Sequence, residues 1–261
     1  MVYQFDDLVY IRGSRIMPWN PVHKMHVYYY LINGLLIDTG PSSLADQAMA
    51  FFQTHTIDQV FLTHIHEDHA GMAYWLEENK KVPIYLHPGS VGDALREPEL
   101  APYRLDIWGR RRAFTAAPMP DTISTEEYIF DVIDSPGHCP CHKTLFLRDK
   151  GWLFSGDLLS VLKPTTVFHE ENLSQMIQSI KIIMELPFHT VFCTHTGILS
   201  KGRELFTRKL NYLQQIQQRV KALRMKGFSD EDITSQLFPG SKSSDNLLAQ
   251  DFSSRNIVAT L

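Results

Sequence analysis

Three histidines and an aspartate crowd into seven consecutive residues, Thr63-His64-Ile65-His66-Glu67-Asp68-His69. Imidazole and carboxylate groups are the ligands that Zn²⁺ prefers, and iron or manganese can take the same set. His64 and His66 lie two residues apart on an extended chain, so their side chains can point to the same side. Asp68 and His69 come after the chain has begun to turn, so they can face a different point. The segment could therefore supply ligand pairs to two neighbouring metal ions.

This cluster lies between two predicted elements. The apolar run Val60-Phe61-Leu62 before it predicts a buried strand, and Ala70–Leu76 after it predicts the start of a helix. Open α/β sheets bind their ligands at the carboxyl ends of their strands. We therefore expect the cluster on a loop at such an edge.

Three more residues of ligand type follow predicted strands in the second half of the chain. Each stands beside a small or turn-forming residue that would expose it: they are His138 after Pro136-Gly137, Asp157 after Gly156, and His195 before Gly197. One such coincidence carries little weight, whereas three of them together with the first cluster indicate a shared site.

The order of these residues resembles the motif of the metallo-β-lactamase superfamily. The resemblance rests on His64-x-His66-x-Asp68-His69 followed by His138, Asp157 and His195, and on the acidic turn Asp38-Thr39-Gly40 before them. It covers about the first 200 residues. It implies an α/β fold, the αββα sandwich of two mixed β-sheets with flanking helices and the metals at one edge.

The resemblance also implies a role for each residue. The first metal would take His64, His66 and His138, the second would take Asp68, His69 and His195, and Asp157 would bridge the two. Asp38 would hold the metal loop in place without touching a metal. His142 could brace a carboxylate or a backbone carbonyl of the metal site, or it could be an ordinary hydrogen-bonded surface residue.

Such a dinuclear centre implies hydrolysis. Two cations, expected to be two Zn²⁺ per chain with Fe or Mn as alternatives, would share a hydroxide that Asp68 orients as the catalytic residue. The expected substrate is an ester, thioester or lactone of a small molecule.

The chain departs from the wider family pattern in two places. Many members have glycine before a second histidine where this chain reads Cys139-Pro140-Cys141-His142, and many read Pro-Gly-His-Gly where this chain has Cys193-Thr194-His195-Thr196-Gly197. Neither change removes a ligand, but both leave the subfamily open, glyoxalase II thioesterases and lactonases included. Cys139 and Cys141 are expected to be small buried residues, with a redox or thiolate-ligand role as the alternative.

Residues 89–121 are rich in proline, basic in the middle and without clear periodicity, which indicates a lid or insertion. Four of its residues could grip an anionic or aromatic substrate, or could belong to a solvated basic loop: Trp108, Arg110, Arg111 and Arg112. Phe168 and His169 follow the Asp157 turn and could line the same pocket.

The remaining pattern predicts strands at Leu8–Ile16 and Val27–Ile32, with an Asn33-Gly34 hairpin before Leu35-Leu36-Ile37. We expect a catalytic domain over residues 1–200 and a helical extension over 201–261 packed on the core. That extension would contain helices at Glu204–Met225 and Asp230–Leu237, and its apolar stripe could instead pack on a second subunit in a homodimer.

Composition limits the partners. The 261 residues carry a formal net charge of −4, which gives no general attraction to nucleic acid or to an anionic membrane. No apolar stretch is long enough to span a bilayer, the first residues lack the features of a signal peptide, and the three cysteines do not resemble a secreted disulfide framework. We expect a soluble, cytoplasmic protein with a small-molecule substrate and no nucleic acid or membrane partner.

Two other function classes stay open. A phosphodiesterase or nuclease of the same superfamily is favoured by the three arginines and the basic tail, and disfavoured by the net charge. An iron-dependent oxidoreductase of the persulfide dioxygenase type is compatible with the ligand set. Relatives that reduce oxygen usually carry glutamate at the position of His66 and an added flavin domain, which this chain lacks.

Overall fold

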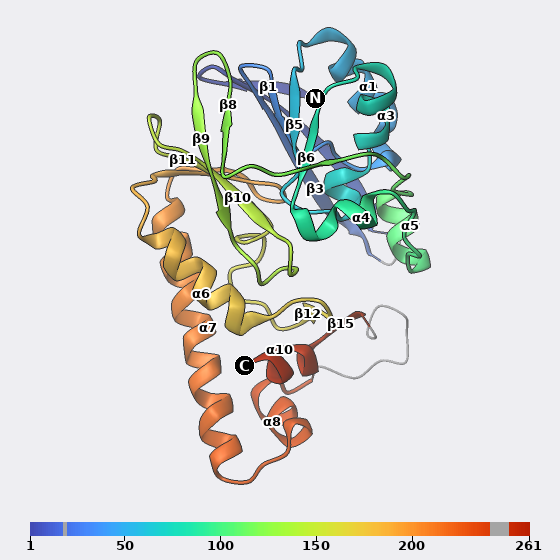
Figure 1. The fold of residues 1–261 in the computed structure, drawn as a ribbon. Coiled ribbons are helices and arrows are strands. Elements are labelled where there is room, and N and C mark those ends of the chain that lie inside the picture. The colour runs from blue at the N-terminus through green and yellow to red at the C-terminus, as the bar shows by residue number, and fades with distance from the viewer. Residues whose placement is uncertain (18–19, 241–250) are drawn as a thin grey trace.

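Two β-sheets pack face to face with helices on their outer faces, which confirms the αββα sandwich (Figure 1). The computed structural model describes residues 1–17, 20–240 and 251–261. Among these described residues, no helix combines the length and the apolar character that crossing a bilayer requires.

The first sheet is antiparallel in its first half and parallel in its second. Its strands follow chain order: β1 (Val2–Phe5), β2 (Leu8–Met17), β3 (Asn20–Ile32), β4 (Leu35–Ile37), β5 (Gln59–Phe61), β6 (Ile84–Leu86) and β7 (Ala117–Pro118). Asn33 and Gly34 turn the chain between β3 and β4 with φ angles of 44° and 79°, as a tight hairpin requires, so the hairpin prediction is confirmed.

The second sheet is also mixed. Its order is β14 (Gly197–Leu199), β13 (Thr190–Cys193), β11 (Trp152–Gly156), β10 (Lys143–Leu147), β9 (Ile129–Asp134) and β8 (Thr122–Ser124). Only β11 and β13 pair in parallel, and the helix that connects them crosses the outer face of the sheet. A two-stranded ribbon joins β12 (Val167–Phe168) to β15 (Phe252–Ser253).

Helices of the first half cover the outer face of the first sheet. They are η1 (Ser42–Leu44), α1 (Ala45–Thr54), α2 (Glu67–Ala70), α3 (Ala73–Asn79), η2 (Pro88–Ser90), α4 (Val91–Ala94) and α5 (Pro102–Trp108). In α1 the buried residues are Ala48, Phe51 and Phe52, whose spacing places them on one face of the helix against the sheet.

Helices of the second half cover the second sheet. They are α6 (Leu173–Met184), α7 (Gly202–Met225), α8 (Asp230–Leu237) and α10 (Ser254–Thr260). The helix α7 lies along α6 and then continues past the sandwich to α8 and α10 (Figure 1). These helices share one hydrophobic cluster with β10, β11 and β13. The helices predicted at Glu204–Met225 and Asp230–Leu237 correspond to α7 and α8.

Aromatic side chains fill the space between the sheets. Tyr30, Phe154 and Phe192 are almost fully buried, and the rings of Phe154 and Phe192 stack with centroids 4.7 Å apart. Fully burying one such side chain stabilises the fold by roughly 1.5–3 kcal/mol. This packing fixes the ends of β11 and β13, which carry two of the predicted site residues.

Residues 89–121 are more regular than their sequence indicates, because α4, α5 and β7 lie within them. The helices span four and seven residues, too few for a periodic apolar pattern to be visible. Pro102 stands at the start of α5, where its missing N–H costs nothing.

Candidate metal centre

All of the predicted ligand residues lie at one edge of the sandwich, just after strands. His64 and His66 follow β5, and His138, Asp157 and His195 follow β9, β11 and β13. The chain enters α2 directly after His66, so Asp68 and His69 stand on a helical turn. That turn aims them at a second point, as expected from the sequence.

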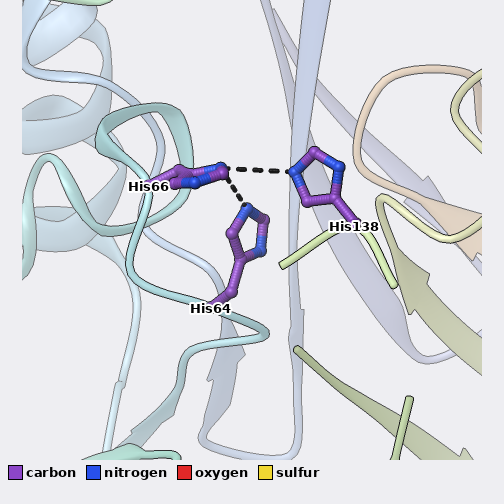
Figure 2. A group of neighbouring side chains, drawn as sticks. All are labelled: His64, His66 and His138. Atoms are coloured by element: carbon purple, nitrogen blue, oxygen red, sulfur yellow. Dashed lines mark hydrogen bonds between the residues drawn. The ribbon is translucent and has the colours of Figure 1, made fainter. Parts of the chain in front are cut away.

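Three histidines form the first cluster (Figure 2). Nδ1 of His66 lies 3.0 Å from Nε2 of His64 and 3.2 Å from Nε2 of His138. Three ring nitrogens aimed at one point cannot all donate to and accept from one another, since a neutral imidazole has one donor and one acceptor. A cation between them would satisfy all three lone pairs.

Asp68, His69 and His195 form the second cluster. Oδ2 of Asp68 lies 3.2 Å from Nε2 of His195 and 3.7 Å from Nε2 of His69. Both imidazoles therefore point one nitrogen at the same carboxylate.

Asp157 lies between the two clusters. Its Oδ1 is 3.4 Å from Nε2 of His69, and its Oδ2 is 3.2 Å from Nε2 of His195 and 3.5 Å from Nε2 of His138. One carboxylate thus contacts histidines of both clusters, which is the arrangement that a bridging ligand needs.

The electrostatics differ between the clusters. Burial lowers the pKa of His64 and of His138 well below the ordinary value, so both imidazoles are neutral. Burial opposes the charged form of His69 as well, but the neighbouring carboxylates outweigh it and hold the pKa of His69 well above its usual range. Asp157 is held ionised for the complementary reason: burial would raise its pKa, and nearby imidazoles, His195 foremost, lower it well below normal.

Two buried polar atoms in this group have no hydrogen-bond partner, Nε2 of His69 and Oδ1 of Asp157. Leaving a buried polar atom unpaired costs about 1–3 kcal/mol, so such atoms in a folded protein call for an explanation. Both atoms belong to groups that can hold a metal ion, and the donor set of imidazole nitrogens and carboxylate oxygens suits divalent zinc, iron or manganese. The residues present therefore fit a dinuclear metal centre.

Asp38 supports the second cluster from below. It is 1% exposed, its Oδ2 lies 2.7 Å from Nδ1 of His69, and its Oδ1 accepts from the backbone N–H and the hydroxyl of Thr63. The residue has a φ angle of 59°, a left-handed conformation that aspartate tolerates better than most residues. The carboxylate thereby ties β4, the metal loop and His69 together.

His142 holds the backbone that carries Asp157. It is fully buried, its Nε2 accepts from the N–H of Asp157 at 3.1 Å, and its Nδ1 lies 2.8 Å from the hydroxyl of Ser135. Burial lowers the pKa of His142 to about 3, so the ring stays neutral. Gly156 has a φ angle of 48°, and a Cβ there would come within 2.5 Å of Nε2 of His142, so this position requires glycine.

A cavity of about 460 Å³ opens onto both clusters. Trp108 and Phe168, both predicted as substrate residues, line it. The ring centroid of Trp108 lies 6.1 Å from that of His195, and the centroid of Phe168 lies 5.9 Å from that of His66.

None of the three consecutive arginines lines this cavity, so of the two roles left open by the sequence the surface role describes Arg110 and Arg112 better. Arg110 and Arg112 are more than half exposed and pair with Glu97 and Glu78 at the surface. Gly109 has a φ angle of 78° and ends α5 directly before these arginines, so they do not continue the helix that carries Trp108.

Arg111 and His169 line a second cavity of about 570 Å³, which shares His66, Arg104 and Phe168 with the first. Arg111 is buried and donates to the backbone carbonyls of Asp93 and Arg96. His169 is half exposed and lies 3.7 Å from Asp251.

All three cysteines are free thiols. Cys139 and Cys193 are buried, and burial raises the pKa of Cys139, so its thiol is protonated and inert. Cys139 and Cys141 border the second cavity and belong to neither ligand cluster.

Several residues that line the first cavity were not predicted from the sequence: Tyr103, Arg104, Val161, Glu171, Lys209 and Phe252. Arg104 precedes Trp108 by one helical turn, and this spacing could have pointed to it. The others reach the cavity only through tertiary packing.

Residues 25–195 match the family model of the metallo-beta-lactamase superfamily. The chain belongs to this superfamily. A beta-lactamase domain protein from Burkholderia ambifaria has a similar fold, with a TM-score of 0.72 and 18% sequence identity. The match covers 100% of this chain and 86% of that one.

Two bacterial relatives within the superfamily are named hydroxyacylglutathione hydrolase. The protein from Nitrosomonas eutropha is 28% identical over 190 residues, which cover 68% of this chain and 61% of the relative. The protein from Legionella pneumophila strain Lens is 30% identical over 219 residues, which cover 77% of this chain and 76% of the relative.

Proposed function

We propose that the protein is a metal-dependent hydrolase that cleaves an ester, thioester or lactone of a small molecule. The observation that carries this proposal is the convergence of two ligand clusters on Asp157 at the floor of a cavity. Relatives named hydroxyacylglutathione hydrolase support an enzyme and favour a thioester among these substrates.

In this proposal His64, His66 and His138 hold one cation, Asp68, His69 and His195 hold the other, and Asp157 contacts both. We propose zinc as the native metal, since imidazole and carboxylate ligands suit it. When bound, two such cations supply Lewis acidity toward a carbonyl oxygen and lower the pKa of water toward neutrality.

Asp68 is proposed to orient the attacking water. Burial would raise the pKa of Asp68, but His69 and His195 lower it, so the carboxylate is ionised and can only accept hydrogen bonds. An acceptor of this kind fixes the direction of a water lone pair toward the scissile carbon.

The size of the cavity favours a small molecule over a nucleic acid. A volume of about 460 Å³ suits a small molecule. Arg104, a basic side chain that lines the cavity near the metal edge, is engaged by both carboxylate oxygens of Glu67. The surface arginines that favoured a phosphodiesterase, Arg110 and Arg112, lie outside the cavity.

A substrate panel on metal-loaded protein tests the proposal. Purified protein of measured metal content is assayed with a thioester, a lactone and bis-nitrophenyl phosphate under the same conditions. We expect hydrolysis of the thioester or lactone, abolished by a chelator and restored by Zn²⁺ or Mn²⁺.

Two outcomes would replace the proposal. Cleavage of the phosphodiester alone would assign the protein to the phosphodiesterases of the superfamily. Iron as the bound metal, together with oxygen consumption on a persulfide and no hydrolysis, would assign it to the iron-dependent oxidoreductases.

A further inference from the structure

The mouth of the metal cavity exposes large apolar side chains to water. Val161 and Phe252 both line the cavity, and their exposed fractions are 53% and 37%. Apolar surface is more stable when it is removed from water, so a rim of this kind favours a ligand that covers it.

Phe252 reaches the cavity because the C-terminal strand is fixed beside it. β15 pairs with β12, the hydroxyl of Ser254 donates to the carbonyl of Thr165 at 2.7 Å, and Nδ2 of Asn256 donates to the carbonyl of Val167 at 3.0 Å. These contacts hold the strand against the loop that follows Asp157.

A second contact attaches the same strand to α5 across the cavity rim. The hydroxyl of Tyr103 donates to Oδ2 of Asp251 at 2.6 Å, and a short bond to a carboxylate is a strong one. Tyr103 and Asp251 therefore join the two segments that carry Trp108 and Phe252.

The ring of Phe252 packs beside Phe168, with centroids 5.2 Å apart, and the guanidinium carbon of Arg104 lies 4.8 Å from the centroid of Phe168. Phe168 and Phe252 thus form an aromatic pair, in which Phe168 lies near His66 and Phe252 lies on the outer side. An aromatic or branched aliphatic group could stack on this pair while the scissile bond reaches the metal edge.

Phe252 also lies outside residues 25–195, the part of the chain that matches the superfamily model. The apolar rim is therefore built in part by a segment that this model does not include.

We propose that Phe252 and Val161 select substrates in which one of the two groups joined by the scissile bond is bulky and apolar, aromatic or branched aliphatic. This inference rests on the proposed hydrolase function for its kinetic test. Its binding test stands without catalysis.

The kinetic test compares two pairs of thioesters. In the first pair the acyl group varies: N-acetylcysteamine carries an acetyl or a phenylacetyl group. In the second pair the leaving group varies: the acetyl group is joined to N-acetylcysteamine or to benzyl mercaptan. In at least one pair we expect the bulky thioester to have the higher kcat/KM. Phe252→Ala and Val161→Ser should each reduce that preference by about tenfold, because the KM of the bulky thioester rises. Phe228→Ala is the matched control, since Phe228 is an exposed phenylalanine on the loop between α7 and α8, and it should change neither pair.

The binding test uses thioethers that cannot be hydrolysed, in calorimetry with the metal-loaded protein. S-methyl N-acetylcysteamine is compared with S-phenylethyl N-acetylcysteamine for the acyl side, and with benzyl methyl sulfide for the leaving-group side. We expect at least one aromatic thioether to bind more tightly than the S-methyl compound, and Phe252→Ala and Val161→Ser each to reduce that difference. Equal binding of all three thioethers by the wild-type protein, or an unchanged difference in both variants, would overturn the inference. If binding behaves as expected while no thioester is cleaved, the proposed hydrolase function fails and the apolar rim stands.

Discussion

Oδ2 of Asp38 lies 2.7 Å from Nδ1 of His69, and both side chains are buried beneath the candidate metal centre. Nδ1 of His69 donates in this contact, so Nε2 is the ring nitrogen that faces the second cluster, where a bound metal ion would displace its proton. Asp38 thus binds one nitrogen of the His69 ring, and the other nitrogen, Nε2, is buried without a hydrogen-bond partner.

Asp38→Asn should weaken metal binding at the second cluster by about 10- to 100-fold, because an amide binds the Nδ1–H less strongly and can present it with a donor instead. Asparagine tolerates the left-handed φ angle, so the fold should persist. Competition with a chromogenic chelator measures the affinity. Asp46→Asn, an exposed carboxylate of α1, is the control, and equal affinities for both variants would refute the role of Asp38.

Glu171 should make the metal-free protein less stable as pH rises. Burial raises the pKa of Glu171 to about 7, from an ordinary value near 4.5, so the folded state holds more protons than the unfolded state between these values. As far as Glu171 is concerned, the free energy of unfolding is therefore highest below pH 4.5 and falls as the pH rises through about 7.

Glu171→Gln removes this titration and should keep the contact with the N–H of Phe168. We expect the variant to unfold at the same urea concentration as the wild type near pH 4.5, and to be more stable by about 2–3 kcal/mol at pH 8. The exposed Glu185→Gln should show no such difference. A constant offset between Glu171→Gln and wild type at both pH values would contradict the assignment.

The ion pair of Glu67 and Arg104 fastens the metal loop to α5. Nε and Nη2 of Arg104 lie 2.6 and 2.7 Å from the two oxygens of Glu67, which is 2% exposed. Arg104→Met leaves the buried carboxylate without its partner and should cost about 3–5 kcal/mol of unfolding free energy. Urea denaturation measures the loss.

Adding Glu67→Gln to Arg104→Met should recover part of that loss, since no buried charge is then left unpaired. Arg112→Met provides the matched control, because Arg112 and Glu78 are both more than half exposed, and it should cost no more than about 1 kcal/mol. If both single arginine variants lose equal stability, the Glu67 pair is not a structural link.

The sequence could predict the candidate site because its chemistry is local. His138, Asp157 and His195 each follow a short strand and stand beside a turn residue, so their placement at one edge follows from strand ends alone. The superfamily motif added the pairing of residues into two clusters.

The walls of the cavity could not be predicted, because they depend on tertiary contacts. Phe252 reaches the cavity through the pairing of β15 with β12, and a two-residue strand leaves no pattern in the sequence. The sequence could not decide between the two roles of the arginines, because the end of α5 at Gly109 is not visible as a periodicity. The cytoplasmic location, the homodimer and the boundary near residue 200 stay predictions.

Metal titration of the stripped protein tests the central claim most directly. Protein freed of metal by a chelator, and checked by elemental analysis, is titrated with Zn²⁺ while bound metal and thioester hydrolysis are followed together. We predict two equivalents bound per chain in the wild type, hydrolysis only in the presence of metal, and loss of tight binding and activity in Asp157→Ala with the fold retained. Full hydrolysis by the metal-free protein, or a wild-type chain that binds no divalent transition metal, would contradict the account.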